Sequence, residues 1–324
     1  MDWMTLPELT SAREIVSTHV PPTPTHNWPL LDQRAGGEVW VKHENHSPVG
    51  AFKVRGGLVY LTRLKAEHPD LAGVITATTG NHGQSVGRAA RMVGLSATIV
   101  VPKGNNPGKN AAMAAQGVDL IEHGDDFQAA KEFAEGLAAA RGLHMVPSFH
   151  PWLVQGVASY GLELFEAQPD LDTVYVPIGL GSGICAVIAA RDALGLKTEI
   201  VGVVAEGAPC YALSFEAGRV IATNGVETIA EGLAVRQPDA QALDIICKGA
   251  ARIVTVSDDE ISAAMAAYFT DTHNLAEGAG AATLAARLQE RDAMAGKKTG
   301  VVLSGGNVDK DLLVRVLAGK GAGG

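Results

Sequence analysis

The sequence predicts an α/β protein with parallel sheets, and three observations support this fold class. A short apolar run, a glycine-rich turn and an amphipathic helix recur along the chain, which is the pattern of βαβ units. The apolar runs are continuous rather than alternating, as expected for strands that are buried on both faces. The 324 residues with 47 % hydrophobic content are enough for one large domain or two of ordinary size.

The predicted elements follow this pattern in chain order. Each unit has a strand, a turn and a helix, and the strand of the next unit comes soon after. Three pairs of segments show it, namely 73–94 with 97–102, 117–124 with 126–142, and 173–195 with 199–207. A last helix is expected over residues 309–317, and the glycine-rich tail that follows should fray.

Composition and charge restrict the class of partner. The net charge of −9 disfavours nucleic acid and anionic membranes, so we expect a small-molecule substrate. The N-terminus does not resemble a signal peptide, and no apolar run is long enough to span a membrane. Three widely spaced cysteines, Cys185, Cys210 and Cys247, indicate free thiols in a reducing cytosol. A cytoplasmic location follows as an expectation.

The stretch "SPVGAFKVRGG", residues 47–57, places Lys53 among small and apolar residues. A buried amine beside a cation has a lowered pKa, so it can attack a carbonyl and later act as a base. Arg55 is a candidate for that cation. The alternatives are that Lys53 is only structural and that Arg55 pairs at the surface.

The stretch "VPIGLGSGI" has Gly179, Gly181 and Gly183 between a strand and a helix. Such a loop lets backbone N–H groups close around an anion, with a helix N-terminus behind them. The spacing is neither G-x-G-x-x-G nor a Walker loop, so a phosphate fits but a dinucleotide-dependent oxidoreductase does not. The alternative is a tight turn that lets the helix pack on the sheet.

Two further turns carry polar groups. "TATTGNHGQ" brings the hydroxyls of Thr78 and Thr79 together with free N–H groups, which suits a carboxylate; the alternative is a helix N-cap by Thr or Asn. "VVLSGGNVD" ends a strand at Ser304 and turns toward Asn307, and here the alternative is a capped turn.

A lysine, a phosphate loop and a carboxylate loop together resemble the fold-type II pyridoxal-phosphate enzymes, the tryptophan-synthase β-like superfamily. Within it the chain is most similar to the serine/threonine dehydratases and serine racemases. Six segments occur in family order and cover nearly the whole chain: "VKHENHSPVGAFKVRGG", "TTGNHGQSVGRAAR", "VPIGLGSG", "ETIAEGLAVRQP", "LAEGAGAATLAA" and "VVLSGGNVD".

The resemblance implies two open twisted parallel-sheet α/β lobes with the cofactor, pyridoxal 5'-phosphate, in the cleft between them. Residues 1–70 and 146–324 would form the large cofactor-binding domain, which would contain Lys53. Residues 71–145 would form the small domain. Relatives are commonly dimers, so a homodimer is expected.

The resemblance also assigns site residues. Lys53 would be the Schiff-base lysine, and Lys53, Thr79 and Ser304 would be catalytic. Ser304 would face the pyridine nitrogen, and Thr78, Thr79, Gly80 and His82 would bind the substrate carboxylate. The residues implied to bind the cofactor are Phe52, Lys53, Asn81, Gly179, Leu180, Gly181, Ser182, Gly183, Gly232, Glu277 and Ser304.

The activity implied is a dehydratase, an ammonia-lyase that converts a β-hydroxy-α-amino acid of the L-threonine or L-serine type to a 2-oxo acid and ammonia. Alternatives are a dehydratase for 3-phenylserine, 3-hydroxyaspartate or an ectoine-pathway intermediate, an amino-acid racemase, a β-replacement synthase, and a non-enzymatic cofactor-binding protein.

Four departures from the family pattern bear on these alternatives. Leu180 interrupts the usual run of glycines, and Thr79 replaces the serine of the racemases. Residues 155–159 replace a common "AGQGT", which indicates an altered substrate pocket. Val204 stands where many relatives have an acidic metal ligand. No metal is expected, because "KHENH" is also one residue short of H-E-x-x-H.

Overall fold

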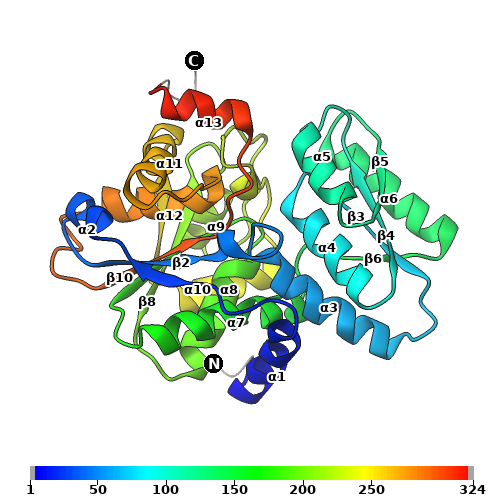
Figure 1. The fold of residues 1–324 in the computed structure, drawn as a ribbon, viewed down its shortest axis with the longest axis horizontal. Helices are drawn as coiled ribbons and strands as arrows, with labels where there is room; N and C mark the ends of the chain where they lie inside the picture. The colour runs from blue at the N-terminus through cyan, green and yellow to red at the C-terminus, as the bar shows by residue number, and fades with distance from the viewer. Residues whose placement is uncertain (1–3, 320–324) are drawn as a thin grey trace. The chain divides into compact units, whose positions relative to one another are not determined.

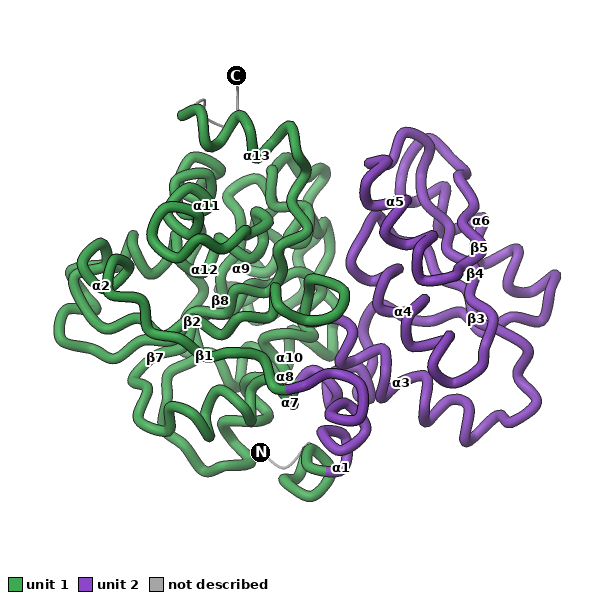
Figure 2. Tube along the Cα trace, in the orientation of Figure 1, with its two compact units in different colours: residues 1–10, 22–52, 158–324 green, residues 11–21, 53–157 purple. Residues whose placement is uncertain are grey.

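The structure is a computed structural model that describes residues 4–319 (Figure 1). Contacts divide the chain into two compact units, which Figure 2 colours separately. Unit 1 consists of the chain up to Thr10, residues 22–52 and the chain from Ala158 onward. Unit 2 consists of residues 11–21 and 53–157. The glycine-rich end of the predicted tail, residues 320–324, lies outside the described residues. Within residues 4–319, no helix has the length and apolar character needed to cross a membrane.

Unit 1 is built on a six-stranded sheet, and the predicted α/β class with parallel strands is confirmed. Its strand order is β1-β2-β10-β7-β8-β9, and all neighbours are parallel except β1, which pairs with β2 in antiparallel fashion. Every residue of β7 and β10 is buried, as expected for central strands covered on both faces. The strand bounds are β1 Thr25–Asn27, β2 Val39–His43, β7 Thr173–Pro177, β8 Glu199–Ala205, β9 Arg252–Val256 and β10 Thr299–Leu303.

Helices cover both faces of this sheet. In Figure 1, α11 and α12 lie on one side and α8 and α10 on the other. Buried residues of α2, α11 and α12 pack with the strands in one apolar core, which includes Leu31, Val41, Val203, Met265 and Leu284. The helix bounds are α2 Pro29–Ala35, η1 Glu44–His46, α8 Ser182–Ala193, α9 Cys210–Ala217, η2 Glu231–Leu233, α10 Ala240–Gly249, α11 Asp258–Thr272, α12 Gly278–Gln289 and α13 Lys310–Leu317.

Unit 2 is built on a four-stranded parallel sheet in the order β5-β4-β3-β6. Alanines of α6 pack on the apolar residues of β3 and β4, and they form the core of one face. The strands are β3 Gly73–Ala77, β4 Ser96–Val101, β5 Asp119–Glu122 and β6 His144–Met145, and the helices are α3 Lys53–Glu67, α4 Asn81–Met92, α5 Pro107–Ala114 and α6 Phe127–Arg141. Two helices have residues in both units, α1 Leu6–Ser17 and α7 Pro151–Ala167.

All four strands of unit 2 lie inside the range 71–145 that the sequence assigns to the small domain. The compact unit is larger, because α3 packs on α4 and brings residues 53–70 with it. Lys53 is therefore grouped with unit 2, while its neighbour Phe52 is grouped with unit 1. The domain limits predicted from the sequence stay a prediction.

Candidate active site

Lys53 is the first residue of α3, and its side chain is half-buried. Its carbonyl oxygen accepts a hydrogen bond from Oγ of Ser85 on α4, at 2.7 Å. Arg55, two residues on, is completely buried, so the alternative of a surface ion pair for Arg55 is wrong. The start of α3 is thus anchored by α4, and the lysine leaves a helix end whose backbone is fixed.

The segment that leads to Lys53 is bonded to the segment after β10. Phe52 N–H donates to the carbonyl of Ser304 at 3.0 Å, and Gly306 N–H donates to the carbonyl of Gly50 at 2.9 Å. Nδ2 of Asn307 donates to the carbonyl of Val49 at 2.8 Å. The segment before Lys53 and the predicted turn after Ser304 therefore meet in unit 1, although they are about 250 residues apart in the chain.

The glycine loop of unit 1 connects β7 to α8 at the carboxyl end of the sheet. Gly181 is the N-cap of α8 and has a left-handed φ of 98°. The N–H groups of the first turn of α8 have no partner within the helix, so they can bind an anion. A Cβ on Gly179 would overlap the carbonyl oxygen of Gly232, which explains why that loop position lacks a side chain. These features fit the predicted phosphate site.

The aromatic ring of Phe52 lies beside the same loop. A Cβ on Gly183 would lie 3.6 Å from Cζ of Phe52, and Oη of Tyr160 donates to the carbonyl of Gly183 at 3.2 Å. The rings of Phe52 and Tyr160 meet edge to face at 6.1 Å. The ring of Phe52 thus lies beside the loop, and its backbone is bonded to Ser304.

Ser304 is buried and directly follows β10, which ends at Leu303 rather than at the serine expected from the sequence. The next residue, Gly305, bonds to Glu277: its carbonyl accepts from Glu277 N–H at 3.1 Å, and a Cβ on Gly305 would overlap the Glu277 carboxylate. Glu277 is also the N-cap residue of α12. Gly232 lies against the same helix, because a Cβ on it would be 2.8 Å from Cβ of Ala279. Unit 1 therefore gathers the predicted cofactor residues Phe52, Gly179–Gly183, Gly232, Glu277 and Ser304.

The polar loop of unit 2 lies between β3 and α4. Gly80 is the N-cap of α4, and no side chain provides a capping bond, so the alternative of an N-cap by Thr or Asn is wrong. Instead Oγ1 of Thr78 accepts from Gly80 N–H at 3.2 Å, and the carbonyl of Thr79 accepts from Nδ2 of Asn105 at 3.2 Å. Asn81 is the first residue of α4. The loop is ordered by its own bonds and leaves a helix N-terminus for an anion.

His82 lies in the first turn of α4, and its Nε2 atom is buried without a hydrogen-bond partner among the described residues. Burial and the positive charge of Lys53 lower the pKa of His82 to about 3, so the imidazole is neutral at physiological pH. A buried nitrogen that lacks a partner costs free energy. A polar ligand group beside this loop would relieve that cost, which fits a substrate-binding role.

The two groups of predicted residues are joined by one peptide bond. Phe52 ends one of the unit 1 segments that hold the predicted cofactor residues, and Lys53 begins α3 of unit 2. The charge of Lys53 lowers the pKa of His82. Sequence analysis did not find three residues that donate hydrogen bonds to the backbone of Lys53 or of the glycine loop, namely Ser85, Tyr160 and Tyr211. No motif marks them, because each hydroxyl bonds to a carbonyl far away in the chain.

The histidine pair of "KHENH" does not form a metal site. His43 ends β2, and both ring nitrogens have partners, Nε1–H of Trp28 at 3.0 Å and Oδ1 of Asn45 at 3.2 Å. His46 belongs to the 3₁₀ turn η1, which follows β2. Glu44 is buried and accepts from Oγ1 of Thr23. Among residues 4–319, no three His, Cys, Asp or Glu side chains are grouped to hold a metal ion.

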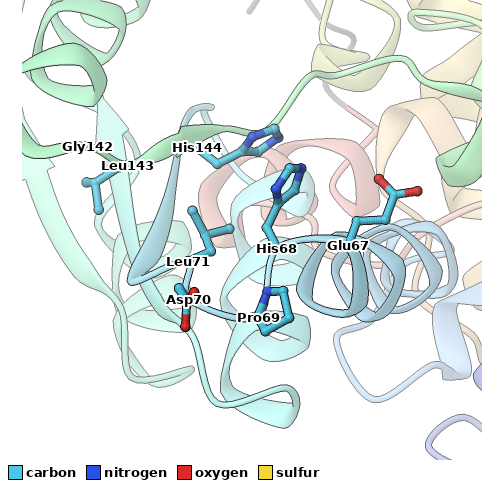
Figure 3. A pocket seen from close by; sticks show the side chains of 8 residues that line it. All are labelled: Glu67, His68, Pro69, Asp70, Leu71, Gly142, Leu143 and His144. Carbon is cyan, nitrogen blue, oxygen red and sulfur yellow. The ribbon is translucent and has the colours of Figure 1, made fainter.

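A pocket in unit 2 lies at the opposite end of α3 from Lys53. Figure 3 shows the imidazoles of His68 and His144 close together there, with Glu67 beside them. The helix between Lys53 and Glu67 is about 21 Å long at 1.5 Å per residue. No residue of the predicted site lines this pocket, so it is not the candidate active site.

The segment 155–159, one of the departures from the family pattern, packs within unit 2 up to Val157. Gln155 accepts a hydrogen bond from Arg63 of α3. A Cβ on Gly156 would overlap the carbonyl of Arg55, and a methyl of Val157 lies beside Gly56. These residues fasten α7 to α3, the helix that begins with Lys53.

Comparison with known proteins identifies the class. The family described as pyridoxal-phosphate dependent enzyme matches residues 16–305. The chain is 32 % identical to L-threonine ammonia-lyase of Thermotoga maritima over 97 % of this chain and 78 % of that protein. It is 30 % identical to L-threo-3-hydroxyaspartate ammonia-lyase of Saccharomyces cerevisiae over 97 % of this chain and 96 % of that protein.

Solved structures agree with the sequence comparison. A pyridoxal 5'-phosphate-dependent aspartate racemase superposes with a TM-score of 0.90 and 29 % identity, covering 97 % of this chain and 98 % of that chain. Threonine deaminase isoform 2 from Solanum lycopersicum superposes with a TM-score of 0.89 and 28 % identity, covering 97 % and 94 %.

The fold, the glycine loop and the matched family together define a fold-type II pyridoxal-phosphate enzyme. The chain belongs to the pyridoxal-phosphate dependent enzyme family, its homologues include threonine dehydratases, and its cofactor is pyridoxal 5'-phosphate. The residues present suit this cofactor, because the loop backbone is bare at Gly179 and the first turn of α8 supplies N–H donors.

Proposed function

We propose that the protein is an ammonia-lyase that dehydrates a β-hydroxy-α-amino acid of the L-threonine or L-serine type to a 2-oxo acid and ammonia. The observation that carries this proposal is the hydrogen bond from Phe52 N–H to the Ser304 carbonyl. It ties the residue before Lys53 to the serine that the family resemblance assigns to the ring nitrogen. Ammonia-lyase relatives that match this chain over most of its length support the same activity.

Each candidate residue has a chemical role in this proposal. The side-chain amine of Lys53 would hold the cofactor and would move the α-proton of the substrate. Bound pyridoxal phosphate supplies the electron sink that this bond cleavage requires. The N–H groups around Gly181–Gly183 would hold the phosphate, Phe52 would contact the ring, and Ser304 would offer a neutral hydroxyl to the ring nitrogen.

The substrate side of the proposed site is the loop from Thr78 to His82. Its N–H groups and hydroxyls bind the substrate carboxylate at the N-terminus of α4. Asn81 would hydrogen-bond the cofactor ring, and the hydroxyl of Thr79 would face the substrate. Glu277 and Gly232 would border the ring. His82, neutral at physiological pH, adds a hydrogen-bonding nitrogen without adding charge.

A second candidate substrate is 3-hydroxyaspartate, and one observation in unit 2 favours it. The aliphatic chain of Lys109 lies against Gly80 of the carboxylate loop, where a Cβ would be 3.4 Å from Cδ of Lys109. An ammonium group near this loop would favour a substrate with a second carboxylate. The yeast relative that matches this chain is named for that substrate.

The test is an assay of 2-oxo acid formation by the purified protein with L-serine, L-threonine, L-threo-3-hydroxyaspartate and 3-phenylserine in turn. Formation of a 2-oxo acid from L-threonine or L-serine is the expected result. Product from 3-hydroxyaspartate alone would move the assignment to the second candidate. Inversion of an amino acid without any 2-oxo acid would refute the dehydratase proposal in favour of a racemase.

The expected homodimer and cytoplasmic location belong to the same proposal. The family resemblance supports the dimer, and free thiols at Cys185, Cys210 and Cys247 are compatible with a reducing compartment. Sedimentation of the purified protein would test the dimer, and fractionation of the source cells would test the location.

A further inference from the structure

The glycine loop of this chain contains a leucine, and the structure shows what holds its backbone in place. Oη of Tyr211, on α9, donates a hydrogen bond to the carbonyl of Leu180 at 3.0 Å. The same oxygen accepts from the N–H of Asp239 at 3.1 Å. Asp239 is the N-cap of α10. One hydroxyl therefore connects the loop to the start of a second helix.

The surroundings of this hydroxyl are closely packed. Tyr211 is almost completely buried. A Cβ on Gly181 would lie 2.7 Å from Cβ of Ala242 and 3.2 Å from Oη of Tyr211, so both residues lie directly behind the loop. Burial raises the pKa of Tyr211 well above its ordinary value, so the hydroxyl keeps its proton and continues to donate.

The direction of the Leu180 carbonyl determines the direction of the next N–H. In a trans peptide the C=O of one residue and the N–H of the following residue point to opposite sides, and none of the described peptide bonds is cis. Because the Leu180 carbonyl points toward Tyr211, the N–H of Gly181 points away from α9. It joins the N–H donors of the first turn of α8, which are left open by helix geometry.

We propose that Tyr211 is a positioning residue that turns the Leu180–Gly181 peptide so that Gly181 N–H donates to the phosphate of the cofactor. An uninterrupted glycine loop would have a flexible backbone at position 180. In this chain Leu180 stands there, and the hydrogen bond from Tyr211 fixes the direction of its carbonyl. This inference rests on the proposed role of the loop in cofactor binding, and it adds a residue that no motif marks.

The test compares Tyr211→Phe with Tyr175→Phe in the full chain after removal of the cofactor. Tyr175 is also a buried tyrosine of unit 1 and donates to the Glu290 carboxylate at 2.6 Å, but it lies inside β7. Two probes are titrated separately, pyridoxal 5'-phosphate and pyridoxal, which lacks the phosphate. Melting temperatures of the cofactor-free variants report on folding.

We expect Tyr211→Phe to weaken pyridoxal 5'-phosphate binding about fivefold to tenfold, the size of one neutral hydrogen bond. Pyridoxal binding should stay the same, and Tyr175→Phe should change neither. Unchanged affinity for pyridoxal 5'-phosphate, or equal loss for both probes, would overturn the inference. If the unsubstituted protein bound no pyridoxal 5'-phosphate, the proposed function itself would be wrong, which is a separate outcome.

A second measurement does not depend on the variant folding. In the unsubstituted cofactor-free protein, adding inorganic phosphate should slow the hydrogen exchange of the amides of Gly181 and of the first residues of α8. An exchange rate at Gly181 that does not change when phosphate is added would contradict the proposed direction of its N–H, whatever the behaviour of Tyr211→Phe.

Discussion

At the scale of single residues, the site depends on Lys53, whose backbone is held by hydrogen bonds on both sides. Phe52 N–H is bonded to Ser304, and the carbonyl of Lys53 is bonded to Ser85. Neither bond involves the Lys53 side chain. Removal of the amine therefore leaves both of these backbone bonds in place.

We expect Lys53→Ala to reduce turnover at least about a thousandfold while the fold stays intact, because the variant loses the base and the covalent anchor of the cofactor. Steady-state assay of 2-oxo acid and circular dichroism check the two parts. Lys65→Ala is the matched control, since Lys65 lies on the same helix and donates to the Pro69 carbonyl at its far end. Full activity of Lys53→Ala would refute its assignment.

Buried His43 should make stability depend on pH. Burial and the charge of His46 lower the pKa of His43 to about 3, against about 6.5 in the unfolded chain. Below about pH 6.5 only the unfolded state takes up the proton, so this contribution to stability is lost as the pH falls toward 3. His43→Gln should lessen the loss of unfolding free energy between about pH 6.5 and about pH 5 by about 2 kcal/mol.

Urea denaturation at the two pH values measures this effect, and His123→Gln serves as the control because His123 is exposed. A His43→Gln variant with the same pH dependence as the unsubstituted protein would mean that His43 titrates normally in the folded state.

At the scale of elements, the turn before Lys53 is shaped by the segment that follows β10. Gly50 has a left-handed φ of 68°, and a Cβ there would lie 2.6 Å from Oδ1 of Asn307. Asn307 cannot move away without losing its bond to the Val49 carbonyl. Asp309 provides the N-cap of α13, the helix that follows this segment.

Gly50→Ala should therefore destabilise the protein more than a strained backbone alone would. Gly104 is the matched control, since its φ is 76° and a Cβ would meet nothing within 4 Å. Gly104→Ala should cost about 1 kcal/mol for the left-handed conformation, and Gly50→Ala about 1–3 kcal/mol beyond that for the collision with Asn307. Equal melting temperatures of the two variants would show that Asn307 yields without cost.

At the scale of the whole molecule, candidate cofactor residues are drawn from both compact units, with the glycine loop in unit 1 and Lys53 and Asn81 in unit 2. A ligand that binds only the folded protein stabilises it by mass action. We expect removal of pyridoxal 5'-phosphate to lower the melting temperature. At a cofactor concentration a hundred times the dissociation constant, the bound cofactor contributes about 3 kcal/mol to the free energy of unfolding.

Calorimetry of the protein with and without cofactor measures this difference. The Gly104→Ala variant should lose the same increment on cofactor removal, since a Cβ at Gly104 would meet nothing within 4 Å. A melting temperature that does not respond to the cofactor would be incompatible with binding to the folded state alone.

The sequence by itself determined the α/β class, the parallel strands and the family. Strand, turn and helix are local patterns, so residues 73–94 and 173–195 could be interpreted within a short window. The candidate lysine and the glycine loop could also be found locally, because a lysine among small residues and three alternating glycines stand out in the sequence. The roles assigned to individual site residues remain proposals.

Only the tertiary structure decided which distant segments meet. It placed β10 between β2 and β7, set β1 antiparallel at the edge, and grouped Lys53 with α4 rather than with Phe52. It also supplied Tyr211 behind Leu180 and Asn307 beneath Gly50. The physical reason is that these contacts join a side chain to a backbone carbonyl or a bare Cα far away in the chain, and such partners leave no periodic pattern in the sequence.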